Sequence, residues 1–466
     1  MNLSLYKHIY LIGIGGIGMS ALARYFNLKG KHVFGYDKVR SDLCLQLENE
    51  GINIHYEDVI SDIPGTIKKA KHDDVLIIYT PAISNENKIF LFFQNQGAKI
   101  LKRAQVLGMI SKQMFTIAVA GTHGKTTTST MLAHILKKSG KEITAFLGGI
   151  SRNYNTNLLF SDKGNILIVE ADEYDKSFLE IYPDIAIITS VDADHLDVYQ
   201  NKNSLDIAFQ QFASQIKPKG FLLVEKSIEL DFAIPAGGRM SNYSVNICSD
   251  YYTQNIRVQN STMFFDIIIS DFFLGSNSKK HQKDIKLSMP GLHNISNAVA
   301  ASAVACYLGV SNNDIVDGLA SFIGINRRFD KHIDTAELVY IDDYAHHPEE
   351  IGATIDATKQ LYPFRELIVV FQPHLFTRTR DFASDFALSL QAADDLVLLD
   401  IYPAREKPIT GITSQIILDL CNNPKKELCS KKELLSILEN KNIDVLLTLG
   451  AGDIASLVQP IKHMLN

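Results

Sequence analysis

The sequence has few of the features that mark secreted, metal-binding or membrane proteins. Its five cysteines are scattered, odd in number and without metal-ligand spacing, which favours reduced cytosolic thiols over a disulfide framework. No apolar run approaches the roughly 20 residues that span a bilayer. There is no long basic run and the net charge is -6, which argues against a nucleic-acid surface. We therefore expect a soluble, cytoplasmic protein without nucleic-acid or membrane partners.

The chain is too long for a single hydrophobic core. Its 466 residues, 46% of them apolar, predict about three globular domains. Changes in pattern place the expected domains at residues 1–112, 113–325 and 326–466. In each of them short apolar strands alternate with helical patterns, which indicates an α/β fold with mostly parallel sheets.

The stretch around which the chain is organised runs from Phe115 to Lys138. It reads as a buried strand, a glycine turn and a helix. The turn, residues 121–127, reads GTHGKTT. Its glycines would let backbone N–H groups face a phosphate chain at the positive end of the helix. Lys125 would reach the β- and γ-phosphates, and the hydroxyl of Thr126 would bind Mg²⁺.

This turn lacks part of the full phosphate-loop pattern. The pattern has a glycine five residues before Gly124, and this chain has Val119 there. The alternative is an ordinary strand-to-helix turn with a chance lysine. We favour a triphosphate site, because the strand and the helix that the motif requires lie on both sides of it.

The first domain carries a second glycine turn. Residues 13–18 fit GxGxxG between an expected strand at 9–14 and a helix from Met19 to about Lys29. Asp37 ends the next strand, about 20 positions later, where a ribose hydroxyl would be met. Residues 7–23 also imitate a secretion signal, but the glycines interrupt the run and favour a nucleotide turn. The alternative function of these glycines is helix–strand packing alone.

Two acidic clusters follow buried strands of the central domain. Glu170 ends the strand at 165–170, and SVDADHLD follows the strand at 185–189. Mg²⁺ bound to ATP needs one or two carboxylates, so we expect Glu170 to hold it and His195 to be a second metal ligand. The alternative is solvated loop charge. Adjacent His346 and His347 would point apart on an extended loop, which argues against a zinc site there.

Two further segments of this domain have recognisable patterns. Residues 251–269 predict a β-hairpin that covers one side of the central sheet. Asn294 and Asn297 lie just before an alanine-rich helix expected at 298–307. Either Asn294 or Ser296 would cap that helix, or the asparagines would bind a base edge; the residues alone leave both possibilities open.

The third domain has expected strands at 338–341, 367–371, 395–400 and 445–449. It also adds Arg378 and Arg380, which could bind a carboxylate as a fork. One nucleotide turn carries the lysine and the threonine of ATP chemistry, and the other suits a nucleotide used as a handle. This inventory fits an ATP-driven enzyme that joins a nucleotide-tagged acid to a small molecule bearing a carboxylate, through an acyl phosphate.

Eight ordered blocks then carry a resemblance that spans the whole chain. They are GIGGIGMSALAR, AVAGTHGKTTT, VEADEYDKSFL, SVDADHLD, PGLHNISNA, RRFD, DDYAHHPEE and FQPHLFTRTRDF. Together they closely resemble the Mur ligases. Within that family, DDYAHHPEE and FQPHLFTRTR resemble the member that adds L-alanine to UDP-N-acetylmuramate. The resemblance implies an N-terminal Rossmann-like domain for the UDP substrate, a central ATPase domain and a Rossmann-like C-terminal domain that closes over the site.

The resemblance also implies roles for individual residues. Thr126, Glu170 and His195 would hold Mg²⁺, and Lys125, His195, Arg327 and His346 would be catalytic. The UDP substrate would contact Gly15, Gly16, Gly18 and Asp37. ATP would contact Gly121, Thr122, His123, Gly124, Lys125, Thr126, Thr127, Asn294, Asn297, Arg327 and Asp343. L-alanine would contact Tyr344, His346, Arg378 and Arg380. The expected enzyme acts in peptidoglycan precursor synthesis as a monomer or weak homodimer.

One departure from the family and several rival functions bear on this interpretation. Other Mur ligases use a carbamylated lysine for the second Mg²⁺, and the matching segment, residues 204–214, has no lysine. The nearest rival is the murein-tripeptide recycling ligase, which joins a larger peptide. Folylpolyglutamate synthetase would not need the uridine site. A NAD-dependent dehydrogenase would leave the phosphate loop without a task, and a nucleotide switch would not need the first domain.

Overall fold

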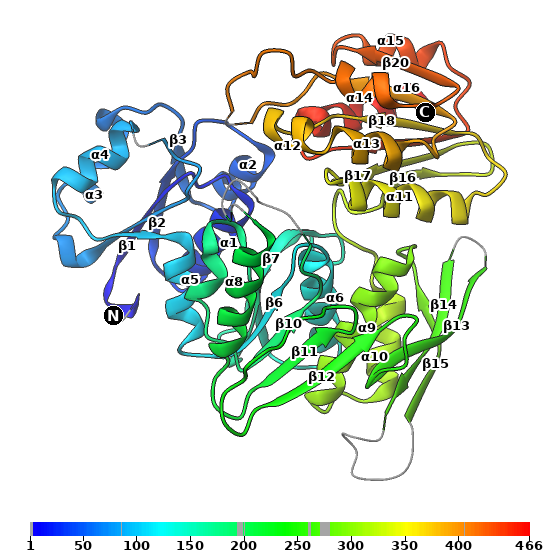
Figure 1. Ribbon diagram of the computed structural model, residues 1–466. Coiled ribbons are helices and arrows are strands. Elements are labelled where there is room, and N and C mark those ends of the chain that lie inside the picture. Colours follow the sequence, from blue (N-terminus) through cyan, green and yellow to red (C-terminus); the bar gives the residue numbers. More distant parts are fainter. Residues whose placement is uncertain are drawn as a thin grey trace. The chain divides into compact units, whose positions relative to one another are not determined.

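The computed structural model describes residues 3–84, 86–192, 199, 201–259, 262–270, 280–404 and 406–466. It holds three mostly parallel β-sheets flanked by helices (Figure 1), which confirms the predicted α/β fold of three domains. Two compact units emerge from the packing: residues 1–254, 267–283 and 296–321 form the first, and residues 255–266, 284–295 and 322–466 form the second. The domain boundaries after residues 112 and 325 stay predictions.

The first sheet has the order β3-β2-β1-β4-β5 and is parallel throughout. Its central strand β1 is buried on both faces, because helices cover both sides of such sheets. The strands are β1 (His8–Ile12), β2 (His32–Tyr36), β3 (Asn53–His55), β4 (Val75–Tyr79) and β5 (Ile100–Lys102); the helices are α1 (Ile17–Leu28), α2 (Asp42–Asn49), α3 (Gly65–Lys68), α4 (Lys88–Asn95) and α5 (Arg103–Ser111). Strand β1 ends two residues earlier than predicted, so the turn already includes Gly13.

The central sheet has the order β15-β14-β13-β12-β11-β10-β6-β9-β7-β8. Its strands are β6 (Phe115–Ala120), β7 (Ile143–Ser151), β8 (Thr156–Leu159), β9 (Ile166–Glu170), β10 (Ile185–Ile188), β11 (Phe221–Glu225), β12 (Arg239–Ser244), β13 (Tyr251–Gln259), β14 (Thr262–Ile269) and β15 (Lys280–Leu287); its helices are α6 (Lys125–Lys138), α8 (Lys202–Ser214), α9 (Leu292–Tyr307) and α10 (Asn312–Ser321). Strand β6 lies between β9 and β10 and parallel to both. The loops after these three strands therefore meet at one edge of the sheet, where ligands bind in such folds.

The predicted hairpin at 251–269 exists as β13 and β14, but its expected place was wrong. The two strands extend the central sheet instead of covering one side of it. Tyr251 and Tyr252 of β13 pair in parallel with Tyr243 and Ser244 of β12. Extended strands leave unpaired N–H and C=O groups at their edges, and joining a neighbouring sheet satisfies them. The proposed turn residues, 260 and 261, lie outside the described residues.

The third sheet has the order β16-β17-β21-β18-β19-β20. Only β16, which pairs with β17, is antiparallel among its described pairings. The strands are β16 (Asp330–Asp334), β17 (Val339–Asp343), β18 (Leu367–Phe371), β19 (Asp395–Leu399), β20 (Lys425–Cys429) and β21 (Val445–Leu449); the helices are α11 (Pro348–Leu361), α12 (Phe376–Asp381), α13 (Ala383–Leu390), α14 (Gln415–Leu420), α15 (Leu434–Glu439) and α16 (Val458–Leu465). The sequence predicted four of these strands and missed the two edge strands.

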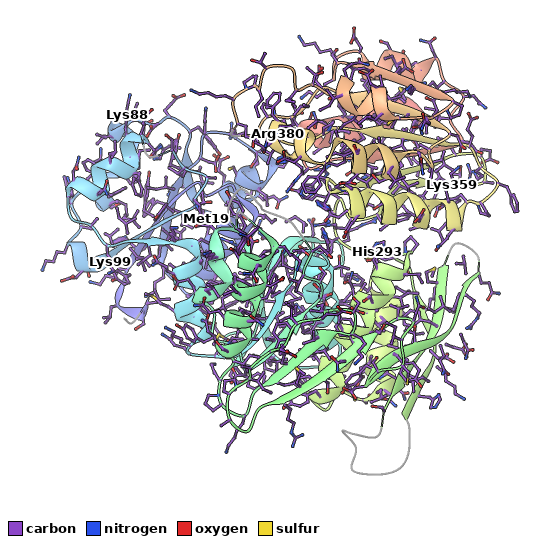
Figure 2. All side chains as sticks on the ribbon, viewed as in Figure 1. Met19, Lys88, Lys99, His293, Lys359 and Arg380 are labelled. Atoms are coloured by element: carbon purple, nitrogen blue, oxygen red, sulfur yellow. The ribbon has the colours of Figure 1, made fainter. Side chains whose placement is uncertain are left out.

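Apolar side chains fill the layers between the strands and the helices (Figure 2). One continuous cluster in the first unit includes residues from both the first and the central sheet, among them Ile9, Ala118 and Val169, together with Leu22 of α1. The third sheet has separate clusters on its two sides. Among the described helices, none combines the length and the apolar character needed to cross a membrane.

Candidate active site

The glycine turn between β6 and α6 comes too close to its neighbours for any other residue type. Gly121 has φ +136° and Gly124, the N-cap of α6, has φ +81°. A Cβ on Gly121 would lie 2.1 Å from Oγ1 of Thr189, and one on Gly124 would lie 2.5 Å from Oδ1 of Asn297. Glycine at both positions lets the backbone fold tightly before the helix begins. The N-terminus of a 14-residue helix then faces the turn.

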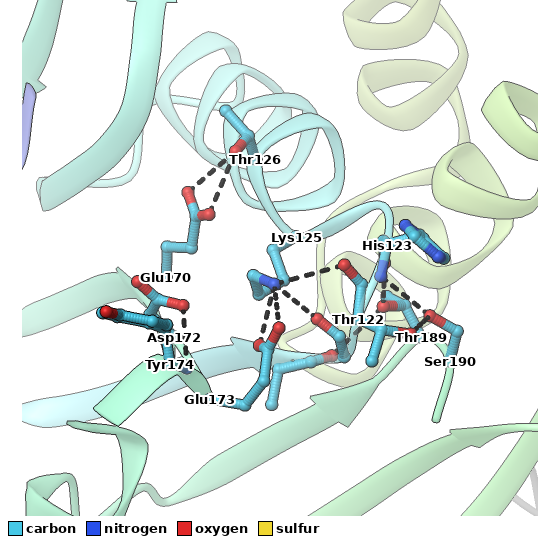
Figure 3. A network of polar contacts seen from close by, with 12 residues as sticks. Thr122, His123, Lys125, Thr126, Glu170, Asp172, Glu173, Tyr174, Thr189 and Ser190 are labelled. Atoms are coloured by element: carbon cyan, nitrogen blue, oxygen red, sulfur yellow. Dashed lines mark hydrogen bonds and ion pairs between the residues drawn. The ribbon is translucent and has the colours of Figure 1, made fainter. Parts of the chain in front are cut away.

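The turn is held by the segment that follows β10 (Figure 3). The main-chain N–H of His123 donates to Oγ of Ser190 at 2.9 Å, and that of Thr122 donates to the Ser190 carbonyl at 3.2 Å. Thr122 Oγ1 lies 2.8 Å from Ser190 Oγ and accepts from the N–H of Asp192 at 3.0 Å. The sequence pattern indicated Ser190 only as the first residue of the acidic segment SVDADHLD and did not predict its contact with the turn.

Lys125 is the first residue of α6, and its ammonium group lies under the turn. Its Nζ donates to the Gly121 carbonyl at 2.7 Å and to the two carboxylate oxygens of Glu173 at 2.8 and 3.0 Å. Burial lowers the pKa of Lys125, but the charges of Glu173, Asp172 and Glu170 outweigh burial and raise the pKa above its usual range. The lysine is therefore a fixed cation. The sequence did not single out Glu173 within VEADEYD.

Thr126 and Glu170 form a pair of oxygen ligands beside the lysine (Figure 3). The hydroxyl of Thr126 donates to both carboxylate oxygens of Glu170, at 3.0 and 2.9 Å. Gly148 of β7 backs this pair, since a Cβ there would lie 1.8 Å from Oε2 of Glu170. Hydroxyl and carboxylate oxygens are the ligands that Mg²⁺ prefers beside a nucleotide. The donor set thus fits Mg²⁺. Thr127, next in the predicted ATP stretch, is buried in the first turn of α6.

Asn294 and Asn297 lie inside α9 rather than before it. The helix begins at Leu292, directly after Gly291 with φ +94°, so capping of a helix at 298 by Asn294 or Ser296 was a wrong prediction. Oδ1 of Asn297 accepts from the hydroxyl of Thr128 on α6 at 3.0 Å. Nδ2 of Asn294 donates to the Pro290 carbonyl at 2.7 Å. Asn297 therefore lies against the helix that begins at the glycine turn.

The first domain contains a cavity of about 820 Å³ beside its own glycine turn. The cavity is lined by residues that include Gly13, Gly15, Gly16, Tyr36, Asp37, Tyr56, Asp58, Thr80 and Asn87. Asp37 Oδ2 accepts from the N–H of Gly15 at 2.8 Å, and its Oδ1 accepts from the N–H of Val39 at 3.1 Å. Gly18 does not line the cavity. It lies under Arg103, whose Nη1 would be 2.2 Å from a Cβ on Gly18.

In the second unit, Arg327 is fixed by the third sheet. It has φ +62°, its Nε donates to Oδ2 of Asp342 at 2.9 Å and its Nη2 donates to the Gly450 carbonyl at 2.6 Å. Asp342 is completely buried. The guanidinium of Arg327 also lies 5.3 Å from the ring centre of Tyr344, at cation–π distance. These contacts hold one face of Arg327 and fix the direction of its side chain.

The loop after β17 gathers several of the predicted residues. Asp343 accepts from the N–H groups of Phe329 and Ala345, at 2.6 and 2.7 Å. Burial raises the pKa of the Asp343 carboxyl to about 6, against the lowering effect of Arg328 and these donors. His346 Nδ1 lies 3.1 Å from Oε2 of Glu350. The His346 ring packs edge-on against Tyr344 and His374, with ring centres 5.2 and 5.9 Å apart.

The two predicted arginines of α12 differ in their surroundings. Arg378 is buried, whereas Arg380 is on the surface (Figure 2) and donates to both carboxylate oxygens of Asp381 at 2.7 and 3.1 Å. His374 joins His346 and was missed by the sequence reading, although it lies in the quoted block FQPHLF. His195, the expected second metal ligand, lies outside the described residues.

Comparison with known proteins supplies the family. Three sequence models match in order: "Mur ligase family, catalytic domain" at residues 8–114, "Mur ligase middle domain" at 119–305 and "Mur ligase, glutamate ligase domain" at 327–452. A curated relative from Parabacteroides distasonis, named UDP-N-acetylmuramate–L-alanine ligase, is 46% identical over 465 residues, which cover 100% of this chain and 98% of the relative. The chain belongs to the Mur ligase family.

Solved structures of other Mur ligases have the same fold. The UDP-N-acetylmuramate-alanine ligase MurC of Thermotoga maritima aligns with a TM-score of 0.79 at 27% identity and covers 98% of both chains. A murein peptide ligase from Psychrobacter arcticus aligns with a TM-score of 0.71 at 23% identity, again over 98% of both chains. The second likeness shows the fold alone. Mur ligases are ATP-dependent ligases, so this Mur ligase is an enzyme that uses ATP.

Proposed function

We propose that this Mur ligase joins L-alanine to UDP-N-acetylmuramate with ATP, in the synthesis of peptidoglycan precursors. The products would be UDP-N-acetylmuramoyl-L-alanine, ADP and phosphate. The observation that carries the proposal is the 46% identity, over the whole chain, to a relative named for this reaction. We propose a cytoplasmic location for the enzyme.

The reaction would take place in two steps. A carboxylate oxygen of the muramyl group attacks the γ-phosphorus of ATP, and ADP leaves with the electron pair of the broken P–O bond. The amine of L-alanine then attacks the acyl carbon, phosphate leaves, and the amine loses a proton. Both steps bring anions together, so catalysis consists mainly of positioning and charge neutralisation.

The phosphate loop would supply most of that neutralisation. The N–H groups at residues 121–124 and the N-terminus of α6 would hold the phosphates. The cation of Lys125, 2.7 Å from the carbonyl of Gly121, would contact the β- and γ-phosphates. Thr126 and Glu170 would hold Mg²⁺, which would offset charge on the phosphates when bound. His195 is proposed as the ligand of a second Mg²⁺.

The remaining proposed roles concern substrate binding. The UDP group would occupy the 820 Å³ cavity of the first domain, with Gly15 and Gly16 along its diphosphate; Gly18 would shape the turn from beneath Arg103. Asp37 would fix the turn and meet the ribose. Further roles are proposed for Asn294 and Asn297 at the adenine, Arg327 at the ATP phosphates, Asp343 at the ATP ribose, and Tyr344, His346, Arg378 and Arg380 at L-alanine. Arg378 is buried and Arg380 is exposed, so we propose that the two arginines do not contact L-alanine in the same way.

Phosphate release is the measurement that tests the proposal. Purified enzyme, ATP and Mg²⁺ are mixed with UDP-N-acetylmuramate, with and without L-alanine, and the product is weighed by mass spectrometry. We expect release that requires both substrates, and a product heavier by one alanyl residue. Release with L-alanyl-D-glutamyl-diaminopimelate but not with L-alanine would instead identify a murein-tripeptide ligase of the same mechanism. No release with either amine would contradict the proposed function.

A further inference from the structure

The buried carboxylate of Glu173 takes up most of the hydrogen-bonding capacity of the phosphate-loop lysine. An ammonium group has three N–H donors. Nζ of Lys125 lies 2.7 Å from the Gly121 carbonyl oxygen and 3.4 Å from that of Thr122, and the two carboxylate oxygens of Glu173 lie 2.8 and 3.0 Å away. The Glu173 side chain is 0% exposed and that of Lys125 is 12% exposed. The ion pair is therefore almost completely removed from water.

Two hydrogen bonds to the main chain of Glu173 hold this residue in place. Its carbonyl accepts from the hydroxyl of the buried Tyr199 at 2.6 Å and from the N–H of Lys176 at 2.9 Å. Asp175 and Lys176 then adopt φ +54° and +56°, which turns the chain sharply after Glu173. Unlike the half-exposed Asp175, Glu173 is an internal residue whose charge is aimed at Lys125.

We infer that Glu173 is a positioning residue that holds Lys125 until nucleotide binds and makes nucleotide binding depend on a divalent cation. The inference rests on the proposed ATP site. Phosphate oxygens that contact Lys125 must take over an N–H that now faces Glu173 or a carbonyl of the turn. They must also approach a carboxylate that lies beside Glu170 and Asp172, whose charges act on the same lysine. The negative charges of these carboxylates repel a nucleotide polyphosphate unless a cation binds with it.

A purely structural role for Glu173 makes a different prediction. If Glu173 only supported the fold, its replacement would weaken nucleotide binding equally with and without Mg²⁺. If Glu173 competes with phosphate for Lys125, loss of its charge strengthens binding most where no divalent cation is present. The ratio of the ADP dissociation constant in EDTA to that in Mg²⁺ therefore separates the two roles.

The experiment measures ADP binding to the full-length enzyme by calorimetry, in EDTA and in Mg²⁺. Glu173→Gln keeps the shape and removes the charge. We expect it to bind ADP about tenfold more tightly than the natural enzyme in EDTA, with a ratio lowered by about tenfold. Asp175→Asn is the matched control: it removes one charge from the same segment, where Asp175 pairs with Lys102 at 2.8 Å. We expect the control to keep the natural ratio within about twofold.

A second pair of variants keeps the test open if Glu173→Gln does not fold. Lys125→Ala and Lys125→Ala/Glu173→Gln differ only at Glu173, and the double variant leaves no unpaired charge in the interior. Adding Glu173→Gln to Lys125→Ala should tighten ADP binding in EDTA about tenfold. An unchanged ratio in Glu173→Gln, or no gain in the double variant, would overturn the inference. Absence of ADP binding to the natural enzyme in Mg²⁺ would contradict the proposed ATP site itself.

Discussion

The two glycine turns of this Mur ligase have the same local plan and different side chains. Each follows a parallel strand, β1 or β6, and leads into a helix, α1 or α6. In each turn a main-chain N–H also donates to a side chain of a neighbouring segment. Gly15 donates to Asp37 Oδ2 at 2.8 Å, and His123 donates to Ser190 Oγ at 2.9 Å.

The chemistry that follows the two turns is not the same. Helix α6 begins with Lys125 and Thr126, whose side chains meet Glu173 and Glu170. Helix α1 begins with Ile17 and Gly18, which bring neither a cation nor a hydroxyl. The first turn opens on a cavity of about 820 Å³. The difference teaches that a glycine turn only presents N–H groups, and that the two residues after it decide between holding a nucleotide and reacting with it.

The strongest test of this contrast is Lys125→Ala. We expect kcat/KM for ligation to fall at least ~10³-fold, or about 4 kcal/mol of transition-state stabilisation, because the cation proposed to contact the transferred phosphate is lost. Binding of UDP-N-acetylmuramate should change less than about twofold, since its site uses the other turn. Lys102→Ala, which removes a half-exposed lysine paired with Asp175 at 2.8 Å, is the control. Near-normal turnover in Lys125→Ala would show that the second turn, like the first, only binds a nucleotide and takes no part in the reaction.

The second test concerns how α1 is anchored. Arg24 is 5% exposed; its Nε donates to Glu50 at 2.9 Å, its Nη2 to Gln46 at 3.1 Å, and its Nη1 to Asn157 of β8. Arg24→Ala should lower the free energy of unfolding by about 2 kcal/mol, because the buried amide oxygen of Asn157 loses its donor.

Chemical denaturation measures this loss against a surface arginine. Arg40, whose side chain is 62% exposed, pairs with Glu48 at 3.0 Å on α2. Arg40→Ala should cost less than about 0.5 kcal/mol, since exposed pairs are screened by water. Equal losses in the two variants would mean that the contact of Arg24 with β8 does not anchor the first turn to the central sheet.

The third test weakens the first turn alone. Asp37→Ala removes the acceptor of the Gly15 N–H, so we expect KM for UDP-N-acetylmuramate to rise about tenfold and KM for ATP to stay within about twofold. Asp42→Ala is the control, since Asp42 is an exposed acid in the first turn of α2. Steady-state kinetics in both substrates give the answer. A parallel rise of both KM values would place Asp37 in general stability rather than in the UDP site.

The phosphate loop itself was largely predictable from sequence, because its strand, glycines, lysine and threonine are contiguous. Its partners were not. Glu173 and Ser190 come from segments 48 and 67 residues away from the atoms they bind, and only the strand order β10-β6-β9 brings them together. Strand order depends on how helices pack on the sheet, and a list of apolar runs does not contain it.

Element boundaries failed where a single backbone feature decided them. Gly291, with φ +94°, starts α9 six residues before the predicted alanine-rich segment, which puts Asn297 inside the helix and against α6. The edge strands β16 and β20 were missed because their exposed residues interrupt the apolar pattern. By contrast, β18 and β21 matched their predicted bounds, since every residue in them is buried.

The smallest expected effect concerns the side chains that hold α1 and α6 in place, Arg24 and His134. Where α1 is held by the charged Arg24, α6 is held by a neutral histidine: His134 Nδ1 lies 2.8 Å from the Tyr154 hydroxyl, and its Nε2 lies 3.0 Å from Ser321 Oγ. Burial lowers the pKa of His134 to about 4, helped by Lys138 and Lys137. The folded protein thus binds this proton less tightly than the unfolded chain does.

It follows that the contribution of His134 to stability is complete above about pH 6.5 and is lost as the pH falls toward 4. At pH 5.5 the loss should be about 1 kcal/mol. Urea unfolding of the natural enzyme and of His134→Gln at pH 7.5 and 5.5 measures it, because the glutamine amide keeps a polar contact but has no proton to gain. The difference between the two pH values should be about 1 kcal/mol smaller in His134→Gln. Equal differences would mean that His134 is already charged in the folded protein, and that both helices are anchored by cations.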